Sequence, residues 1–442
     1  MKKTHYTLYT VLFLIIACAF VSSVYYQQKT IVSADNHVDI ASIFSFFVSK
    51  TPAVVALTSA QSANVSNSDS EVLVNSSQST KAVVSDEPKI VKKITLLAVG
   101  DIMMHQNQID SAYNKSADSY DFSEYFKNIN SYLKDGNIVY ANLETPVAGK
   151  DLKYSGYPRF NAPTEILGEL KNNYFTHLAL ANNHALDRGV VGLSNTIKNV
   201  EEAGMITLGA RELESSASSS TINYQITEKN GIKVGFLAYT YGTNGITLPK
   251  NKAGMLSYTD KEQIVKDISD LKKQNVDVIT VGLHFGVEYS RTENASQRSL
   301  AQFACDNGAD IILGDHPHVL QPIVYLNNST NDKKCLAIYS LSNFISGMPN
   351  LYTDLGGILK VDISKGDSLG INSSSITIQP EFFGTWVKRG TDKSGSKYFT
   401  ILPLDADKIP EGIEVTKTEE ARLKTYRTFV DTKIKAGLVG VN

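Results

Sequence analysis

Residues 311–318 have the sequence Ile-Ile-Leu-Gly-Asp-His-Pro-His. Three apolar residues followed by a glycine are typical of a buried strand at the point where it leaves its sheet. Because Pro317 cannot donate a hydrogen bond to a neighbouring strand, we expect His316 and His318 to lie on a loop at the end of that strand. Two neutral imidazoles one residue apart can bind a common divalent transition metal if the loop bends. Two unrelated histidines on a surface loop are the alternative.

The composition limits the class of protein. The chain has 442 residues, of which 42% are hydrophobic, so it is long enough to bury a large core. Its formal net charge is −2. This balance excludes a strongly basic overall field, and we expect no nucleic-acid partner, although a local basic pocket is compatible with it.

The N-terminus predicts the location of the protein. An apolar run from Tyr6 to Val24 follows Lys2 and Lys3 and is about long enough to cross a bilayer, with its positive flank inside. We therefore expect residues 1–26 to form a retained, single-pass anchor in the cell membrane, with the body of the protein extracellular. A cleaved secretory signal and a lipoprotein attached through Cys18 are the alternatives.

The rest of the chain divides by composition and periodicity. Residues 27–90 contain long stretches rich in small and polar side chains, and we expect them to form a low-complexity, disordered tether. From residue 91 onward, buried-type strands alternate with helices, which favours an α/β fold. We assign residues 91–375 to the main domain, which is β-rich after Leu320. Residues 376–442 are predicted to add strands and a helix that complete the body.

Two cysteines lie in the predicted body, Cys305 and Cys335. With Cys18 they are too few for a disulfide-built scaffold, and they do not have the spacing of zinc ligands. We expect two buried free thiols, with a disulfide as the alternative outside the cytoplasm.

Polar side chains follow five separate predicted strands. They are Asp101; Asn142 and Glu144; Asn182, Asn183 and His184; His284 and Glu288; and Asp315, His316 and His318. Ligands of α/β sheets bind at the carboxyl ends of strands. Core packing requires none of these residue types, so the pattern favours a metal site over a chance cluster. Mixed oxygen and nitrogen donors suit Zn, Mn or Fe better than Ca²⁺.

The order of these motifs resembles that of the CapA/PgsA family of capsule (poly-γ-glutamate) synthesis proteins, within the calcineurin-like metallophosphoesterases. The resemblance spans roughly Ile94 to Ile363 and rests on six segments: Gly100–Met104, Asn142–Pro146, Ala181–His184, His284–Tyr289, Gly314–Pro322 and Tyr339–Phe344. It implies a layered α/β sandwich of the metallophosphoesterase type.

The resemblance also implies a ligand set for one or two divalent ions, with Mn, Fe or Zn expected. The implied ligands are Asp101, Glu144, Asn183, His284, His316 and His318. Glu144 is the candidate bridge between two ions, which would together activate a water and stabilise a phosphoryl oxygen. His184 is the implied catalytic general acid.

This sequence departs from the phosphoesterase pattern at two positions. The usual first motif is Asp-x-His, whereas here His105 follows Asp101 by four residues, and we place His105 outside the ligand set. Glu144 replaces the aspartate of the second motif. We therefore expect the site to hold one ion, or two with altered spacing.

The remaining polar residues are assigned to substrate or to supporting hydrogen bonds: Asn142, Asn182, Glu288, Tyr289, Asp315 and Asn343. Glu288 and Tyr289 follow His284 closely, which favours a substrate groove. Asn343 and Asp315 are candidates for orienting a ligand histidine. His177 lies inside an apolar strand and is expected to be a core histidine.

The resemblance and the N-terminus together favour an anchored protein of poly-γ-glutamate synthesis or export. Its expected partners are poly-γ-glutamate or another anionic envelope polymer, and the ligase and membrane subunits of the polymer synthase. A metal-dependent phosphoesterase of the cell envelope is the main alternative, and a non-catalytic polymer-binding module is the third.

Overall fold

The computed structural model describes residues 91–213, 223–367, 374–391, 395, 397–411 and 413–438. The expected anchor (residues 1–26) and the tether (residues 27–90) lie outside these residues and stay predictions, as do the domain boundaries. None of the helices in the described ranges is long and apolar enough to cross a membrane.

The first of two large sheets has eight strands. Their order is β16 (Lys397–Pro403), β15 (Ser374–Thr391), β14 (Leu355–Asp367), β1 (Lys92–Ile102), β4 (Ile138–Leu143), β5 (His177–Ala179) and β6 (Ile206–Leu208), and β13 (Asn343–Ile345) pairs with β1. β1, β4, β5 and β6 run parallel, whereas β14, β15 and β16 are antiparallel to their neighbours. Three C-terminal strands therefore extend the sheet that begins with β1.

The second sheet has six strands. Their order is β11 (Leu320–Asn327), β12 (Lys334–Leu341), β10 (Ile311–Asp315), β9 (Val278–His284), β8 (Ile232–Thr240) and β7 (Gln225–Lys229). The four inner strands are parallel, and the two edge strands are antiparallel to them. The alternation of strands and helices predicted the α/β class correctly.

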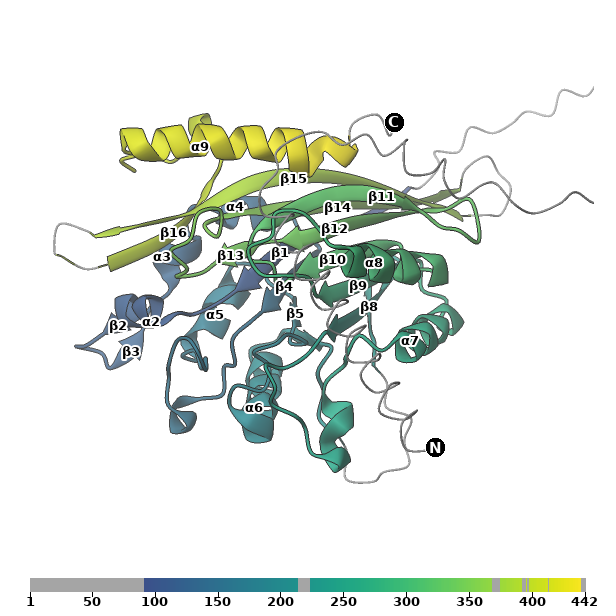
Figure 1. The fold of residues 1–442 in the computed structure, drawn as a ribbon, viewed down its shortest axis with the longest axis horizontal. Coiled ribbons are helices and arrows are strands. Elements are labelled where there is room, and N and C mark those ends of the chain that lie inside the picture. Colours follow the sequence, from purple (N-terminus) through teal and green to yellow (C-terminus); the bar gives the residue numbers. More distant parts are fainter. Residues whose placement is uncertain are drawn as a thin grey trace, which may run out of the picture. The chain divides into compact units, whose positions relative to one another are not determined.

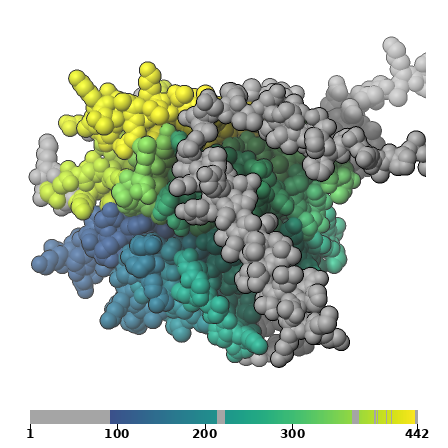
Figure 2. Space-filling model, in the orientation of Figure 1, coloured from purple at the N-terminus to yellow at the C-terminus, as the bar shows by residue number. Residues whose placement is uncertain are grey.

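Helices lie outside the sheets (Figure 1). α7 (Lys261–Lys273) and α8 (Ala295–Asn307) pack with the apolar side chains of β8, β9 and β10 in a core of their own. α5 (Glu165–Asn172) and α6 (Gly189–Glu202) follow β4 and β5 along the chain. α9 (Lys417–Phe429) lies along β15, as Figure 2 also shows in yellow, and its Tyr426 hydroxyl donates to Asp354 Oδ1 at 2.6 Å.

The smaller elements are α2 (Gln106–Ala112), β2 (Tyr113–Asn114), β3 (Ser119–Tyr120), α3 (Ser123–Phe126), α4 (Asn130–Leu133), η3 (Lys150–Leu152), η4 (Lys250–Met255), η5 (Ala406–Lys408), η6 (Val430–Ile434) and η7 (Lys435–Leu438). They occupy connections between the longer elements and the end of the described chain.

The two sheets pack face to face around the larger hydrophobic core. Polar contacts also cross this interface: the Tyr140 hydroxyl donates to Asp315 Oδ2 at 3.2 Å, and His177 Nε2 hydrogen-bonds Thr227 Oγ1 at 2.7 Å. His177 is buried, and burial lowers its pKa to about 3, so it is a neutral core histidine as expected.

Gly314 lies within β10 rather than at its end, which differs from the expected turn position. A Cβ atom at this residue would stand 2.2 Å from the carbonyl oxygen of Tyr339 in β12. The glycine is therefore required because the neighbouring backbone comes too close for any side chain.

Cys305 and Cys335 form a disulfide, so the expectation of two free thiols is wrong. Cys305 lies in α8 and Cys335 in β12, and their Cα atoms are 5.8 Å apart. Sequence spacing did not predict this, because only the packing of α8 against the second sheet brings the two residues together.

Removal of the disulfide should lower the free energy of unfolding. The cysteines are 30 residues apart in sequence, and closing a loop of that length stabilises a fold by roughly 3–4 kcal/mol on the loop-entropy model. Denaturant titration with and without reductant measures the loss. A Cys305→Ala/Cys335→Ala variant is the control and should not respond to reductant; equal stability of the oxidised and reduced wild type would contradict the prediction.

Candidate metal centre

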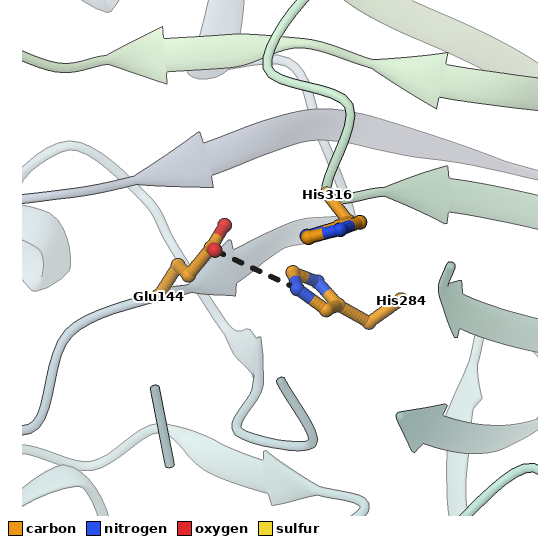
Figure 3. A group of neighbouring side chains, drawn as sticks. All are labelled: Glu144, His284 and His316. Atoms are coloured by element: carbon orange, nitrogen blue, oxygen red, sulfur yellow. Dashed lines mark ion pairs between the residues drawn. The ribbon is translucent and has the colours of Figure 1, made fainter. Parts of the chain in front are cut away.

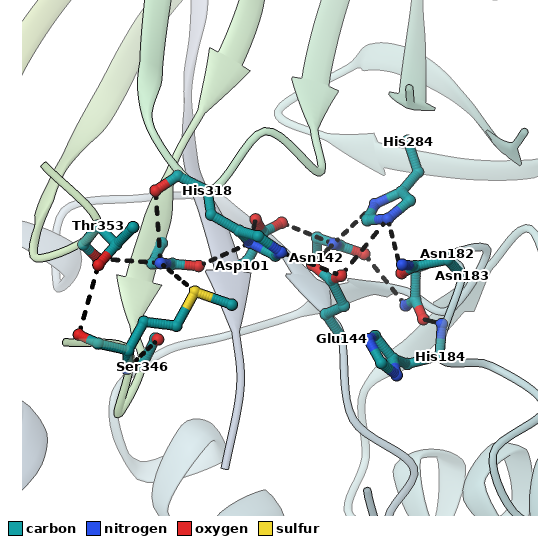
Figure 4. A network of polar contacts seen from close by, with 12 residues as sticks. Asp101, Asn142, Glu144, Asn182, Asn183, His184, His284, His318, Ser346 and Thr353 are labelled. Carbon is teal, nitrogen blue, oxygen red and sulfur yellow. Dashed lines mark hydrogen bonds and ion pairs between the residues drawn. The ribbon is translucent and has the colours of Figure 1, made fainter. Parts of the chain in front are cut away.

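The side chains predicted from the sequence converge at one edge of the two sheets. Asp101 of β1 is opposite Asn142 of β4, and His284 of β9 is opposite Asp315 of β10. Both pairs lie at the carboxyl ends of parallel strands. Because the sheets face each other, these ends meet, and Figure 4 shows the polar network that results.

Three overlapping groups of side chains bring their donor atoms together, each group within 4.8 Å. The groups are Glu144, His284 and His316; Asp101, Glu144 and His318; and Glu288, His316 and His318. All of these residues except Glu288 are buried. Glu144 belongs to two groups, since its Oε1 lies 3.5 Å from His284 Nε2 and 3.9 Å from His318 Nε2. A bridging ligand requires this central position, and Figure 3 shows Glu144 and two imidazoles directed at one another.

The donor set fits a metal ion. Within the part of the chain that the structure describes, Glu144 Oε1 and His316 Nδ1 are buried and have no hydrogen-bond partner. Buried polar atoms in native proteins are nearly always paired, so two such atoms in one site indicate a missing partner. Carboxylate oxygens and neutral imidazole nitrogens are donors that suit a divalent transition metal.

The amide of Asn183 joins the same cluster. Its Oδ1 lies 3.1 Å from His284 Nε2, the nitrogen that faces Glu144, and its Nδ2 donates to Asn244 Oδ1 at 3.3 Å. The amide oxygen is thereby held toward the other donors. This is the orientation that the predicted role of Asn183 as a ligand requires.

The loop after β10 holds its two histidines in unfavourable backbone conformations. His316 has φ of 100° and His318 has φ of 58°, values that cost non-glycine residues about 1–3 kcal/mol each. Tyr289, whose own φ is 64°, lies opposite the loop. Its N–H donates to the carbonyl oxygen of Pro317 at 2.8 Å and holds the bend. The loop therefore has the bend on which the shared metal site of the opening motif depends, and both histidines are buried.

Burial sets the charge of the cluster. It lowers the pKa of His284 well below its usual value, with help from His316 and His318, and lowers the pKa of His316 to about 3. Burial and then the charge of Asp101 raise the pKa of Glu144 well above its usual value. Both shifts favour the neutral, coordinating form of the His284 and His316 imidazoles, and the raised pKa of Glu144 favours a protonated carboxyl group whose proton a cation would displace.

Hydrogen bonds hold the donors in place. Asn142 Nδ2 donates to Asp101 Oδ1 at 2.7 Å and lies 3.2 Å from His284 Nδ1, and Asn343 Oδ1 lies 3.0 Å from His318 Nδ1. Both amides thus contact candidate ligands, and their supporting role stays a prediction. Asn182 Nδ2 donates to the carbonyl oxygen of Leu143 at 2.8 Å, which fixes the backbone beside Glu144. The Asp315 carboxylate accepts from the Tyr140 hydroxyl, and among the described residues it has no hydrogen bond to an imidazole, contrary to its expected role in orienting a ligand histidine.

His184 lies beside the donors and is paired with a residue that the sequence analysis missed. Its Nδ1 is 2.8 Å from Asp187 Oδ2, which also accepts the Phe160 N–H at 2.7 Å. The Phe160 and His184 rings pack in an edge-to-face arrangement, with 4.7 Å between ring centroids. The spacing of three residues between His184 and Asp187 within one turn was the available signal.

A pocket of about 440 Å³ opens next to this pair. Its lining includes Arg159, Asn183, His184, Asn244 and Glu288. The site is therefore open to a ligand on the side of His184.

Two aromatic residues flank the site. Tyr289, assigned to a substrate groove, is 47% exposed, and Tyr241, which the sequence analysis missed, is 49% exposed. The Tyr241 ring lies 4.8 Å from that of His316. The Tyr289 ring lies 6.1 Å from that of His318, and its contact with a substrate stays a prediction.

His105 lies outside all three donor groups. Its Nδ1 accepts the N–H of Gly347 at 3.3 Å, and burial lowers its pKa to about 4. It begins α2, where its carbonyl oxygen accepts the N–H groups of Gln108 and Ile109. The structure thus gives His105 a role in the fold.

Comparison with known proteins gives the family. The model of the bacterial capsule synthesis protein family PGA_cap matches residues 95–348, more than half of the chain. The chain belongs to this family. The match covers all six sequence motifs and every predicted site residue of this PGA_cap protein.

Two relatives are about one-third identical. The capsule biosynthesis protein CapA of Bacillus anthracis is 36% identical over 280 residues, which cover 61% of this chain and 63% of the relative. The PGA biosynthesis protein CapA of Bacillus subtilis (strain 168) is 34% identical over 250 residues, which cover 56% and 62%. The matched part thus spans less than two thirds of either relative.

The solved structures that resemble this chain are only distantly similar to it. The calcineurin-like phosphoesterase YfkN from Bacillus subtilis is 16% identical, with a TM-score of 0.39, over 77% of this chain and 98% of that chain. The assignment to PGA_cap rests on the sequence match.

The metal content of this PGA_cap protein should depend on the two histidines of the opening motif. We expect the full-length wild type to bind one or two equivalents of Mn, Fe or Zn, and a His316→Ala/His318→Ala variant to lose them, because both imidazoles belong to the donor groups. Elemental analysis after dialysis measures the change. A His105→Asn variant is the matched control, since asparagine also begins helices well, and it should keep its metal. Equal metal in the double variant would contradict the site.

Metal affinity should rise with pH because Glu144 must lose a proton. The pKa of Glu144 is raised above its ordinary value of 4.5, so the carboxyl group is protonated at pH values between 4.5 and the raised pKa. Metal binding in this pH range displaces that proton. His316, with a pKa of about 3, is already neutral there. Calorimetry in buffers of different ionisation enthalpy should show about one proton fewer released per ion bound by Glu144→Gln than by wild type. A lower proton release per ion bound in His316→Asn, with wild-type release in Glu144→Gln, would contradict this assignment.

Proposed function

We propose that this protein takes part in the synthesis or export of a capsule polymer, poly-γ-glutamate or another anionic envelope polymer, and that its metal centre acts on the polymer. Membership of the PGA_cap family and the names of both Bacillus relatives support the biological role. The site supports hydrolysis as the chemistry.

One observation carries the chemical part of the proposal. The buried, unpartnered donors Glu144 Oε1 and His316 Nδ1 lie in the same site as the His184–Asp187 pair, and that pair lines an open pocket. A structural metal site needs no adjacent proton donor and no pocket. Hydrolysis needs both, because the leaving group must be protonated and the substrate must reach the metal.

The residues divide the chemical work between them. Six would hold the metal: Asp101, Glu144, Asn183, His284, His316 and His318. The ion would supply Lewis acidity to the attacked group and to the attacking water. Asp187 accepts the proton of His184 Nδ1, so the opposite nitrogen, Nε2, is the one that protonates the leaving atom.

We propose that the protein is held in the cell membrane by residues 1–26 with its body outside the cell. The apolar run from Tyr6 to Val24 supports the anchor. The disulfide between Cys305 and Cys335 supports an oxidising compartment, since such bonds are rare in the cytosol. In that position the protein would meet the polymer together with the ligase and membrane subunits of the synthase.

A metal-dependent phosphoesterase of the cell envelope is the second candidate. The mixed oxygen and nitrogen donors around Glu144 favour it, because a bridged pair of ions suits phosphoryl oxygens. Assay of the full-length, metal-loaded protein on γ-glutamyl oligomers and on phosphate esters separates the two. Binding of the polymer without hydrolysis of either substrate would leave a polymer-binding module.

His184→Ala should lower hydrolysis by about 10²–10⁴-fold, the usual contribution of a general acid, while metal content stays at the wild-type level. Asp187→Asn should lower kcat by a smaller factor, because the imidazole remains but loses the acceptor that orients it. Steady-state kinetics and elemental analysis on the same samples measure both quantities.

His105→Asn again serves as the control and should retain its activity. If His184→Ala lost its metal together with its activity, His184 would be a ligand and its assignment as an acid would be wrong.

A further inference from the structure

The loop between β4 and α5 places an arginine at the edge of the pocket beside His184. Ser155 and Asn161 pair across this loop, with N–H to carbonyl distances of 3.0 and 2.9 Å, so residues 156–160 form a closed tip. Arg159 lies at this tip, is exposed, and lines the pocket. The metal-site residues do not include it.

The arginine is held firmly. Its Nε donates to the carbonyl oxygen of Asp187 at 3.0 Å. Its own carbonyl oxygen accepts from Ser155 Oγ at 2.6 Å and from Arg188 Nη2 at 2.9 Å. The next residue, Phe160, donates its N–H to Asp187 Oδ2. The guanidinium is therefore fixed relative to the His184–Asp187 pair, which removes much of the entropy cost of using it for binding.

The charge of this guanidinium is uncompensated. Among the residues that the structure describes, no carboxylate forms an ion pair with Arg159, whereas Asp187 is already engaged by His184 and by the Phe160 N–H. With Nε occupied, the two Nη groups remain as donors. A guanidinium presents such donors in a fixed geometry that matches the two oxygens of a carboxylate or phosphate.

The opposite charge in the pocket lies nearer the metal donors. Glu288 also lines the pocket, and its carboxylate belongs to the group with His316 and His318. An anion that enters the pocket is thus attracted by Arg159. It is repelled by Glu288 unless a bound metal cation neutralises that carboxylate. The pocket has one end suited to an oxyanion.

We propose that Arg159 binds an oxyanion of the substrate, a carboxylate or a phosphate, on the leaving-group side of the bond that is cleaved. This rests on the proposed function and gives its substrate class: a molecule with a free anionic group next to the scissile bond. For a polymer of acidic units, that group is the carboxylate of the leaving unit, whose leaving atom His184 protonates.

A binding experiment tests the proposal without requiring turnover. The full-length protein carrying His316→Ala/His318→Ala, with and without Arg159→Gln, is titrated in a calorimeter with a γ-glutamate oligomer, its neutral γ-glutamine counterpart and inorganic phosphate. The double alanine background removes two metal donors, so that binding to an ion does not mask binding to Arg159. Glutamine retains an N–H that can reach Asp187, which preserves the loop.

Arg159→Gln should weaken binding of the γ-glutamate oligomer by about tenfold or more, the usual effect of a charged hydrogen bond, and leave the γ-glutamine oligomer unchanged. If only phosphate binding weakens, the oxyanion is a phosphate. Arg298→Gln is the matched control, because Arg298 is an exposed arginine of α8 that pairs with Glu293, and it should bind all three as before.

Three results would each overturn the proposal. Arg159→Gln could leave the affinity for both anions unchanged, or weaken binding of the neutral oligomer equally. The His316→Ala/His318→Ala protein with Arg159 intact could fail to bind either anion. Failure of the proposed function gives a different result. In that case the otherwise unsubstituted protein lacks metal or hydrolysis, while the effect of Arg159→Gln on anion binding persists.

Discussion

The buried carboxylate of Glu144 is the constraint on which the site depends. It is fully buried, its Oε1 has no hydrogen-bond partner among the described residues, and it faces two imidazoles. An unpaired charge in such a place costs several kcal/mol, so the fold must either keep the group protonated or provide a cation. The imidazoles, the amide donors and the bent loop after β10 are arranged around that requirement.

The sequence predicted the site to the extent that the site follows strand ends. Asp101, Asn142 and His284 each lie at the end of an apolar run, and parallel strands bring such positions to one edge. The histidine pair around Pro317 left a metal site and a chance pair equally open, and only the polar residues after the other strands favoured the metal site. Family resemblance supplied the roles, because neither periodicity nor spacing distinguishes a ligand from a supporting amide.

The features that the sequence analysis missed depend on packing between distant segments. The pairing of Cys305 with Cys335 requires α8 to lie against β12. Arg159 reaches Asp187 only because the loop tip folds back onto the segment after β5. Gly314 was taken for a turn residue because a strand glycine and a terminal one look alike in sequence, and only the nearby carbonyl oxygen of Tyr339 distinguishes them.

The donors come from both sheets, and this has a consequence for the order of folding. His318 and Asp101 touch although they are 217 positions apart, and neither sheet alone carries all three members of any group that contains Glu144. An ion therefore has no complete site in a chain whose sheets have formed but not docked. Metal uptake would then follow docking, so that metal occupancy would report that the two halves of the body have assembled.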